Sequence, residues 1–146
     1  MKRPGVGLAT IVMKLKKKEV LLGRRKGSHG EGTWAFPGGH IEFFEGYIDC
    51  FYRELEEETG LTRDNVRLID KFPVAATNDF FKKEGKHYIT LYIRAELISG
   101  EPRVMEPKKC EKWIWSEWYA GLPLNVFVPL HNLRFKQNYD PFKDLK

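Results

Sequence analysis

The sequence predicts an α/β or α+β sandwich whose strands lie on both sides of a central helix in chain order. Three observations support this prediction. Residues 5–14 form an apolar run of strand length, residues 87–97 alternate apolar with polar side chains, and residues 46–59 show helical periodicity. The chain has 146 residues with no internal repeat, low-complexity tract or linker. We therefore expect one domain over residues 1–146.

The first half of the chain is expected to hold a second strand, a short apolar segment and the helix. The strand is expected at 19–24, after a basic turn at 16–18. The apolar segment at 34–36 leads into Pro37-Gly38-Gly39, a sequence typical of turns. The helix at 46–59 is expected to end at Gly60, because glycine accepts the left-handed conformation that closes many helices.

The second half is expected to complete the sheet. Segments 65–72 and 112–115 have the composition of strands, and a final helix is expected within 124–137. In 87–97 the odd-numbered positions from 89 onward are aliphatic, whereas Tyr88, Thr90 and Tyr92 lie on the opposite face. This alternation predicts a strand with one buried face.

Charge is unevenly distributed along the chain. The formal net charge is +5, but residues 39–60 carry seven acids and one base, Arg53. Outside this segment there are 24 basic and 13 acidic residues, a net charge of +11. An acidic segment in a basic chain indicates a cation site that faces an anionic ligand, and it excludes a uniformly basic nucleic-acid coat. We expect no stable nucleic-acid complex.

The two cysteines and the N-terminal segment bear on the compartment. Cys50 and Cys110 are sixty positions apart, without a CxxC motif or a Cys/His cluster, which argues against a disulfide scaffold and a structural zinc site. The apolar stretch 6–13 is short and interrupted, and no run approaches the roughly 18 residues of a membrane span. We expect a reduced, cytoplasmic protein without membrane association.

The predicted helix sorts its side chains into distinct faces. At about 100° per residue, Glu54, Glu57 and Glu58 share an arc of about 100°, and the apolar side chains share another. Three like charges on one arc repel unless a cation lies among them. Their oxygen ligands suit Mg²⁺, with Mn²⁺ as an alternative. On composition alone, an ordinary solvated helix face explains the same residues.

The spacing of these glutamates and of the residues around them favours the metal-site interpretation. Gly39 is followed after five residues by Glu45, and seven residues later by Arg53-Glu54-Leu55-Glu56-Glu57-Glu58-Thr59-Gly60-Leu61. This resembles the Nudix box, G-x5-E-x7-R-E-U-x-E-E-x-G-U with U aliphatic, at all nine fixed positions. At average residue frequencies the chance of such a match is on the order of 10⁻⁷.

The resemblance implies a Nudix α/β/α sandwich with a mixed β-sheet and a catalytic helix that follows a loop. It also implies Mg²⁺-dependent hydrolysis of a nucleoside diphosphate linked to another moiety. In the family, the arginine that matches Arg53 holds a box glutamate in place, and the glutamate that matches Glu45 supports the loop. The metal ligands match Glu54, Glu57, Glu58 and the carbonyl of Gly39. Either Glu54 or one of Glu57 and Glu58 is the general base, and the sequence leaves this open.

Segments outside the box are similar to the MutT-homologue nucleotide triphosphate diphosphatases. These segments are RPGVG at 3–7, residues 21–40, HYIT at 87–90, the EPKKCEKWIW stretch and YDPFK near the end. The likeness implies a homodimer that cleaves (deoxy)nucleoside triphosphates to a nucleoside monophosphate and pyrophosphate. The substrate-binding residues that we predict are Arg25, His40, Thr90, Gly38 and Gly39.

Each predicted substrate contact has a plainer alternative. Arg25 belongs to the cluster Arg24-Arg25-Lys26, which is equally explained as a solvated basic turn. His40 follows the Gly-Gly pair and can face phosphate or serve only in packing. Thr90 lies opposite the aliphatic face of its strand, where it can contact a base or neighbouring side chains.

The sequence departs from the family pattern just before the helix. Many family members have Gly-Glu-Ser/Thr where this chain has Phe44-Glu45-Gly46. Phenylalanine lacks the conformational freedom of glycine, and Gly46 removes a hydroxyl N-cap worth about 1 kcal/mol. We therefore expect the chemistry to be preserved and the loop ahead of the helix to differ.

Two other functions are compatible with the sequence. A Nudix pyrophosphatase that acts on ADP-ribose, a dinucleoside polyphosphate or capped RNA would use the same box. A non-catalytic nucleotide sensor or RNA-binding module would use the basic remainder of the chain. The complete set of acidic box residues argues against the second, because a binding module does not need every metal carboxylate.

Overall fold

A mixed β-sheet forms the centre of the molecule. The computed structural model describes residues 2–145. In the sheet, β1 and β7 pair in parallel and the other neighbouring strands pair antiparallel. The strands are β1 (Gly5–Lys14), β2 (Glu19–Arg25), β3 (Trp34–Ala35), β4 (Gly38–His40), β5 (Val66–Leu68), β6 (Ala75–Phe81), β7 (Lys86–Leu97) and β8 (Cys110–Glu117).

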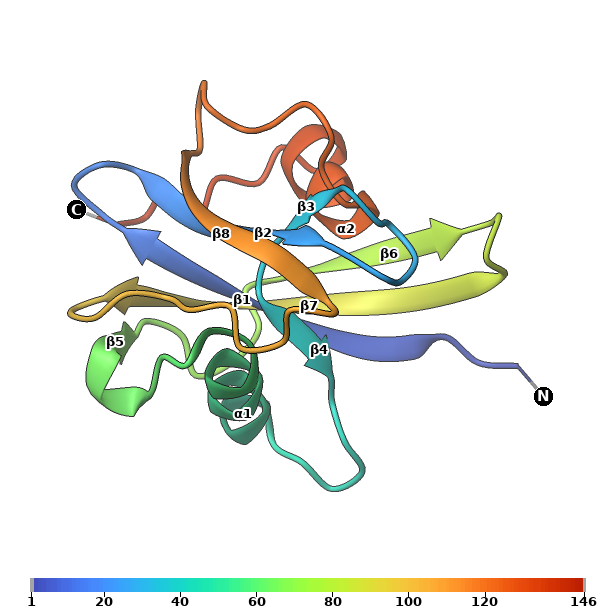
Figure 1. Ribbon diagram of the computed structural model, residues 1–146, viewed down its shortest axis with the longest axis horizontal. Coiled ribbons are helices and arrows are strands. Elements are labelled where there is room, and N and C mark those ends of the chain that lie inside the picture. Colours follow the sequence, from blue (N-terminus) through green and yellow to red (C-terminus); the bar gives the residue numbers. More distant parts are fainter. Residues whose placement is uncertain (1, 146) are drawn as a thin grey trace.

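Helices cover both faces of this sheet. Figure 1 shows α1 (Tyr47–Thr59) below the strands and α2 (Val128–His131) above them. A π-helical turn, η2 (Asn132–Lys136), continues α2, and a 3₁₀ turn, η1 (Arg63–Asn65), precedes β5. The α/β/α sandwich with a mixed sheet, predicted from the sequence, is confirmed. None of the helices between residues 2 and 145 is long and apolar enough to cross a membrane.

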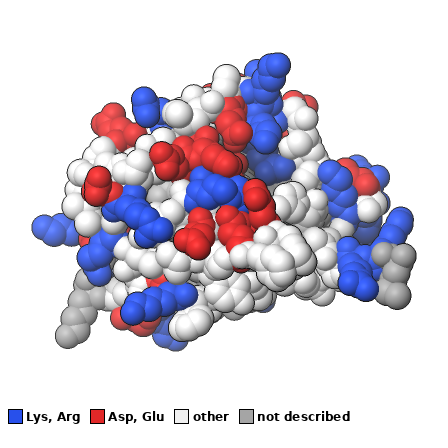
Figure 2. All heavy atoms as spheres, turned by 90° about the horizontal axis from the view of Figure 1, so that it is seen from below, with Lys and Arg blue, Asp and Glu red and all other residues white. Residues whose placement is uncertain are grey.

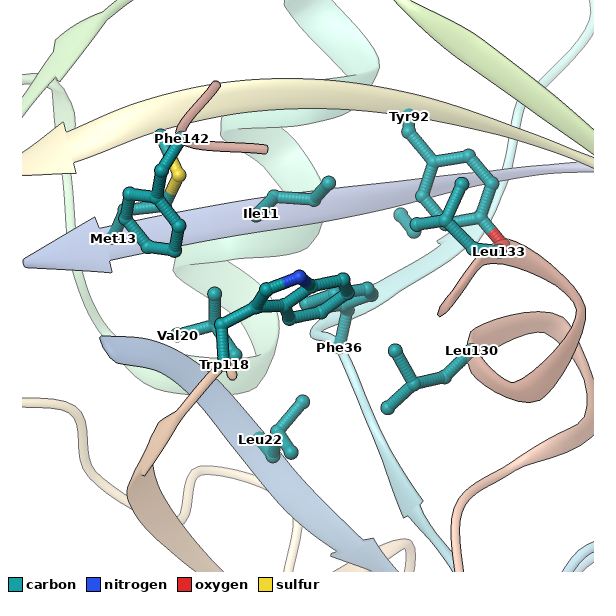
Figure 3. Packing of buried hydrophobic residues seen from close by; sticks show 11 residues of the cluster. Ile11, Met13, Val20, Leu22, Phe36, Tyr92, Trp118, Leu130, Leu133 and Phe142 are labelled. Carbon is teal, nitrogen blue, oxygen red and sulfur yellow. The ribbon is translucent and has the colours of Figure 1, made fainter. Parts of the chain in front are cut away.

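Strand β1 is central because its side chains are buried on both faces. Ile11 and Met13 join the core beneath α2, where Trp118 stacks over Phe36 with 6.3 Å between ring centroids (Figure 3). Val12, on the opposite face of β1, joins the core beneath α1. Most residues of this strand are therefore apolar, since neither face contacts water, and the buried Thr10 donates its hydroxyl to the carbonyl of Pro37.

Helix α1 forms as the sequence predicts. Its apolar face buries Phe51, Leu55 and Cys50 completely against the sheet. The helix ends at Gly60, which has φ of 75° and donates its N–H to the carbonyl of Glu56. A glycine at this point closes the helix without the steric penalty of a Cβ atom.

Three sequence predictions about the sheet are corrected. Residues 38–40 form β4, paired with β1, whereas a turn was predicted at 37–39. Gly38 packs so closely on β1 that a Cβ atom there would overlap the carbonyl oxygen of Leu8. The expected strand at 65–72 spans only Val66–Leu68, and the strand β6 was not predicted. Composition does not reveal these pairings because tertiary contacts decide them.

Strand β7 is buried on both faces near its centre, where one buried face was predicted. Tyr92 is fully buried on the face expected to be open, and Arg94 is only 4% exposed. The segment α2–η2 and the C-terminal chain cover this face, and Tyr92 Oη donates to the carbonyl of Pro129. Alternation along one strand does not show that a later segment returns to cover its polar face.

Arg94 on β7 forms a buried ion pair with Asp70 and also binds the C-terminal segment of the chain. The guanidinium of Arg94 donates from Nε and Nη2 to the two oxygens of Asp70, at 2.9 Å each. Its Nη1 donates to the carbonyl of Pro141 and to Asp144, the latter at 2.6 Å. Only 10% of the Asp70 side chain is exposed, against 66% for Asp144. The carboxylate of Asp70 is therefore the partner that compensates the buried charge of Arg94.

This difference in exposure predicts unequal costs of substitution. Asp70→Asn is expected to lower the free energy of unfolding by about 3 kcal/mol, because it leaves a buried guanidinium incompletely paired. Asp144→Asn removes an exposed charge and is expected to cost less than about 1 kcal/mol. Urea unfolding followed by tryptophan fluorescence measures both, and equal losses would contradict the argument.

Candidate active site

The three box carboxylates lie on one face of α1 but in different surroundings. Glu54 is buried beside Gly39, where a Cβ atom would overlap its carboxylate. Glu58 is half-buried and accepts a 2.8 Å hydrogen bond from the backbone N–H of Gly38. Glu57 has a side chain that is 49% exposed. The site therefore combines two carboxylates held against β4 with one that is half exposed.

Arg53 connects this face of α1 to the preceding loop and to β4. Its Nε and Nη2 donate to both oxygens of Glu45, at 2.7 and 2.9 Å. Nη1 donates to Glu54 at 2.7 Å and to Glu57 at 3.1 Å, and Nη2 also donates to the carbonyl of His40 at 2.9 Å. One side chain thus fixes the positions of three glutamates relative to one another.

Burial and mutual repulsion disturb the ionisation of this cluster. Burial raises the pKa of Glu58 to about 8, although the N–H of Gly38 opposes the shift. Burial also raises the pKa of Glu54, against the hydrogen bond from Arg53. Figure 2 shows acidic side chains gathered around basic ones on the face of the molecule that carries α1. Because neighbouring carboxylates add to the effect of burial, a bound cation would favour the ionised form of these glutamates.

The donor set fits a hard divalent cation. It consists of carboxylate oxygens and backbone carbonyls, the ligands that Mg²⁺ and Mn²⁺ prefer. The missing Cβ of Gly39 leaves room for the Glu54 carboxylate directly against the main chain. Among residues 2–145, no three His, Cys, Asp or Glu side chains already converge on one point. Arg53 instead lies between Glu54 and Glu57.

A fourth acid beside this cluster, Glu106, was not predicted as a site residue. Glu106 lines the same cleft as Glu54, Glu57 and Glu58, and its charge contributes to the raised pKa of Glu58. The 101–109 segment reaches the end of α1, where Arg103 N–H donates to the carbonyl of Thr59 at 2.8 Å. The only available signal was its place in the EPKKCEKWIW stretch.

Two connected hollows adjoin β4. The first is an acidic cleft of about 520 Å³ that contains Arg53 and the carboxylates of α1. The second is an apolar pocket of about 140 Å³ lined by aromatic and aliphatic side chains of β7, β6 and α2. The two hollows share their boundary residues, among them Arg25, His40, Gly38 and Gly39. A ligand with an apolar part and a charged part can therefore occupy both.

The structure brings the predicted substrate residues to this boundary. The guanidinium of Arg25 lies 4.0 Å from the Phe127 ring centroid, and its Nε donates to the carbonyl of His29. Burial lowers the pKa of Arg25, although Glu58 opposes the shift. The His40 side chain is exposed and lines both hollows, and Thr90 lines the apolar pocket.

Aromatic side chains that the sequence did not single out form the walls of the apolar pocket. Phe81, Tyr88 and Phe127 come from β6, β7 and the segment before α2. His29 packs among them, parallel to Tyr88 at 6.0 Å and edge-on to Phe81 at 4.7 Å. Of these residues only Tyr88 could have been found from the sequence, because it shares a face of its strand with Thr90.

Cys50 is a packing residue. It is fully buried among the apolar side chains beneath α1. Burial raises the pKa of its thiol to about 12, so the nucleophilic thiolate is not formed near neutral pH.

Comparison with known proteins then decides the family. A family model described as the NUDIX domain matches residues 1–136. The chain belongs to the Nudix family. Family membership implies a hydrolase that acts on pyrophosphate bonds.

Solved Nudix structures share this fold. The MutT NUDIX hydrolase from Burkholderia pseudomallei is 28% identical, with a TM-score of 0.73 over 86% of this chain and 92% of that one. An Ap4A hydrolase from C. elegans is 22% identical, with a TM-score of 0.64 over 78% and 80% of the two chains. The NUDIX domain of Shewanella oneidensis NrtR, complexed with ADP ribose, is 16% identical, with a TM-score of 0.69 over 94% and 89%.

The contact of Glu45 with Arg53 predicts a pH-dependent stability. Hydrogen bonding from Arg53 lowers the pKa of Glu45 from 4.5 to about 2. Between about pH 2 and pH 4.5 the carboxylate of Glu45 therefore stays ionised in the folded state, whereas the unfolded chain binds a proton there. The stabilisation is complete above about pH 4.5 and disappears as the pH falls toward 2. Glu45→Gln is expected to cost about 1–2 kcal/mol at pH 7 and less at pH 3. Urea unfolding at both values measures this, and a cost independent of pH would contradict it.

Phe44 adopts the left-handed conformation at the position where the family pattern often has glycine. Its φ is 63° and its side chain is 95% exposed. Phe44→Gly relieves a cost of about 1–2 kcal/mol but adds about 0.4–1 kcal/mol of chain entropy to the unfolded state. We expect a net gain of about 0.5–1 kcal/mol in thermal or urea unfolding.

The neighbouring residue supplies the control. Phe43 is 88% exposed and is not among the residues with positive φ. Phe43→Gly therefore relieves no backbone strain, and it is expected to lower the free energy of unfolding slightly. A loss of stability in both variants would show that the conformation at Phe44 carries no strain.

Proposed function

We propose that this Nudix hydrolase cleaves (deoxy)nucleoside triphosphates, oxidised ones included, to a nucleoside monophosphate and pyrophosphate. The observation that carries the proposal is the apolar pocket that shares its boundary residues with the cleft that holds the carboxylates. A nucleobase suits an aromatic-lined pocket, and a polyphosphate suits a cleft that combines carboxylates with basic side chains. The 28% identity to a MutT NUDIX hydrolase supports the same substrate class.

The residues at the boundary would hold the α-phosphate beside the carboxylates. Arg25 is stacked on Phe127 and tied to the carbonyl of His29, so its guanidinium is oriented before a ligand arrives. His40 has an exposed imidazole on the same boundary and can donate to a phosphate oxygen. Together they would orient the phosphate chain toward α1.

Glu54, Glu57, Glu58 and the carbonyl of Gly39 would hold Mg²⁺ or Mn²⁺, with Glu106 beside them. When bound, such an ion neutralises phosphate charge and activates water for attack on phosphorus. The chain itself supplies a general base, either Glu54 or one of Glu57 and Glu58. Arg53 and Glu45 keep these carboxylates in register.

The decisive experiment identifies products and varies the metal carboxylates. With Mg²⁺, canonical and oxidised nucleoside triphosphates are expected to yield monophosphate and pyrophosphate. Glu57→Gln and Glu58→Gln are each expected to lower activity at least about 100-fold, because loss of an outer partner of a metal alone costs 10–100-fold. Glu56→Gln is the matched control, since Glu56 is exposed on another face of the same helix and should retain activity.

Each other outcome points to a different conclusion. Full activity in both glutamine variants would contradict the metal assignment. Preferred cleavage of ADP-ribose, a dinucleoside polyphosphate or capped RNA would assign the enzyme to another Nudix activity. No turnover of any substrate would favour a non-catalytic nucleotide sensor.

The homodimer and the cytoplasmic location are parts of the same proposal. Both cysteines are free in the structure, which is compatible with a reducing compartment. The homodimer stays a prediction from the resemblance to the MutT homologues.

A further inference from the structure

A buried acid lies behind the wall of the apolar pocket. Asp79 on β6 is fully buried, and β6 runs antiparallel beside β7 (Figure 1). Its carboxylate contacts three side chains: Thr90 on β7, Thr77 on β6 and Asn132 on η2. Of these four residues only Thr90 lines the apolar pocket. Asp79 therefore acts on a ligand only through Thr90.

The hydrogen bonds around Asp79 determine the direction in which the Thr90 hydroxyl donates its proton. A carboxylate only accepts hydrogen bonds, so each partner must donate. Asn132 Nδ2 donates to Oδ1 at 2.8 Å, and its second contact, 3.4 Å to the carbonyl of Asn78, fixes the amide orientation. Thr77 Oγ1 donates to Oδ2 at 3.0 Å, and Thr90 Oγ1 donates to the same oxygen at 2.6 Å. The single proton of the Thr90 hydroxyl is therefore directed away from the pocket.

The nearby hydroxyl of Tyr92 does not alter this result. Tyr92 Oη lies 2.9 Å from Thr77 Oγ1 and 3.1 Å from the carbonyl of Pro129, so its own proton is used inside the protein. Between residues 2 and 145, Asp79 is the one hydrogen-bond partner found for Thr90 Oγ1. Because this proton is used, the remaining lone pairs are the only hydrogen-bonding capacity that Thr90 Oγ1 can offer to a molecule in the pocket.

We infer that Asp79 is a positioning residue that makes Thr90 an obligate acceptor, so that the pocket selects nucleobases with an exocyclic amino group over those with a carbonyl or hydrogen in its place. The inference rests on the proposed function in that it assigns a nucleobase to this pocket. An acceptor that faces a carbonyl leaves two acceptors in contact without a proton, which is costly away from water. A site that uses a hydrogen bond for recognition therefore discriminates strongly against an analogue that cannot complete it.

Product-like monophosphates test the inference without requiring catalysis. Two pairs differ at an exocyclic position: GMP against IMP, which differ only by the amino group, and CMP against UMP, in which ring N3 also changes from an acceptor to a donor. Isothermal titration calorimetry on the full chain is expected to show about tenfold tighter binding of CMP than UMP and of GMP than IMP. Ratios near one in both pairs would overturn the inference.

Asp79→Asn reverses the polarity with little change in shape. Its amide nitrogen takes the place of Oδ2 and donates to Thr90, which frees the hydroxyl proton of Thr90 to point into the pocket. The CMP/UMP ratio is expected to fall at least tenfold, and the GMP/IMP ratio to approach one. Unchanged ratios in this variant would also overturn the inference. A purely structural role for Asp79 would weaken all four ligands alike.

Two further variants separate polarity from stability. Thr77→Val removes one donor to the same carboxylate but leaves the Thr90 hydroxyl committed, so both ratios should be retained. Thr90→Val removes the acceptor and should abolish both preferences, which provides the test if Asp79→Asn does not fold. Preferences that survive in Thr90→Val would contradict the inference.

Hydrolysis of the triphosphates by the unaltered enzyme is measured in parallel. Hydrolysis without an amino preference would overturn only the inference about Asp79. An amino preference without hydrolysis would overturn the proposed activity and leave this inference standing.

Discussion

The geometry of the candidate site depends on the guanidinium of Arg53. Three glutamates on adjoining turns and loops repel one another, and a helix that presents them would lose stability without a fixed positive charge among them. Arg53 supplies that charge and also joins three elements, because it contacts the loop at Glu45, the strand β4 at His40 and the helix at Glu54 and Glu57. Arg53 therefore holds these carboxylates close together in spite of their mutual repulsion.

Strand β7 links this charged face to the apolar pocket. Its side chains alternate between the core beneath α1, which holds Ile93, and the opposite face, where Tyr88 and Thr90 line the pocket. Because β1 separates β7 from β2 and also pairs with β4, one rigid unit carries both hollows. The distance between the two hollows is consequently set by sheet geometry more than by loop conformation.

Local signals allowed the helix, the acidic cluster and most strands to be predicted from the sequence. Helix α1 has its own period and its own glycine stop, and the Nudix box fixes Arg53 and the glutamates by spacing alone. The apolar pocket was not predictable in this way, because Phe81 and Phe127 meet only after β6 pairs with β7 and the chain returns through α2. Strand β4 was mistaken for a turn because Pro37-Gly38-Gly39 has turn composition. These glycines are needed instead for close contact with β1 and with Glu54.

That close contact has a consequence for how the site can diversify. At Gly38 a methyl group would overlap the main chain of β1, and at Gly39 it would overlap the buried Glu54 carboxylate, so a side chain is strongly disfavoured at both positions. Arg25 and Glu106 line the same cleft from other segments of the chain. Changes of specificity on this scaffold are therefore expected at such side chains and not at the two glycines.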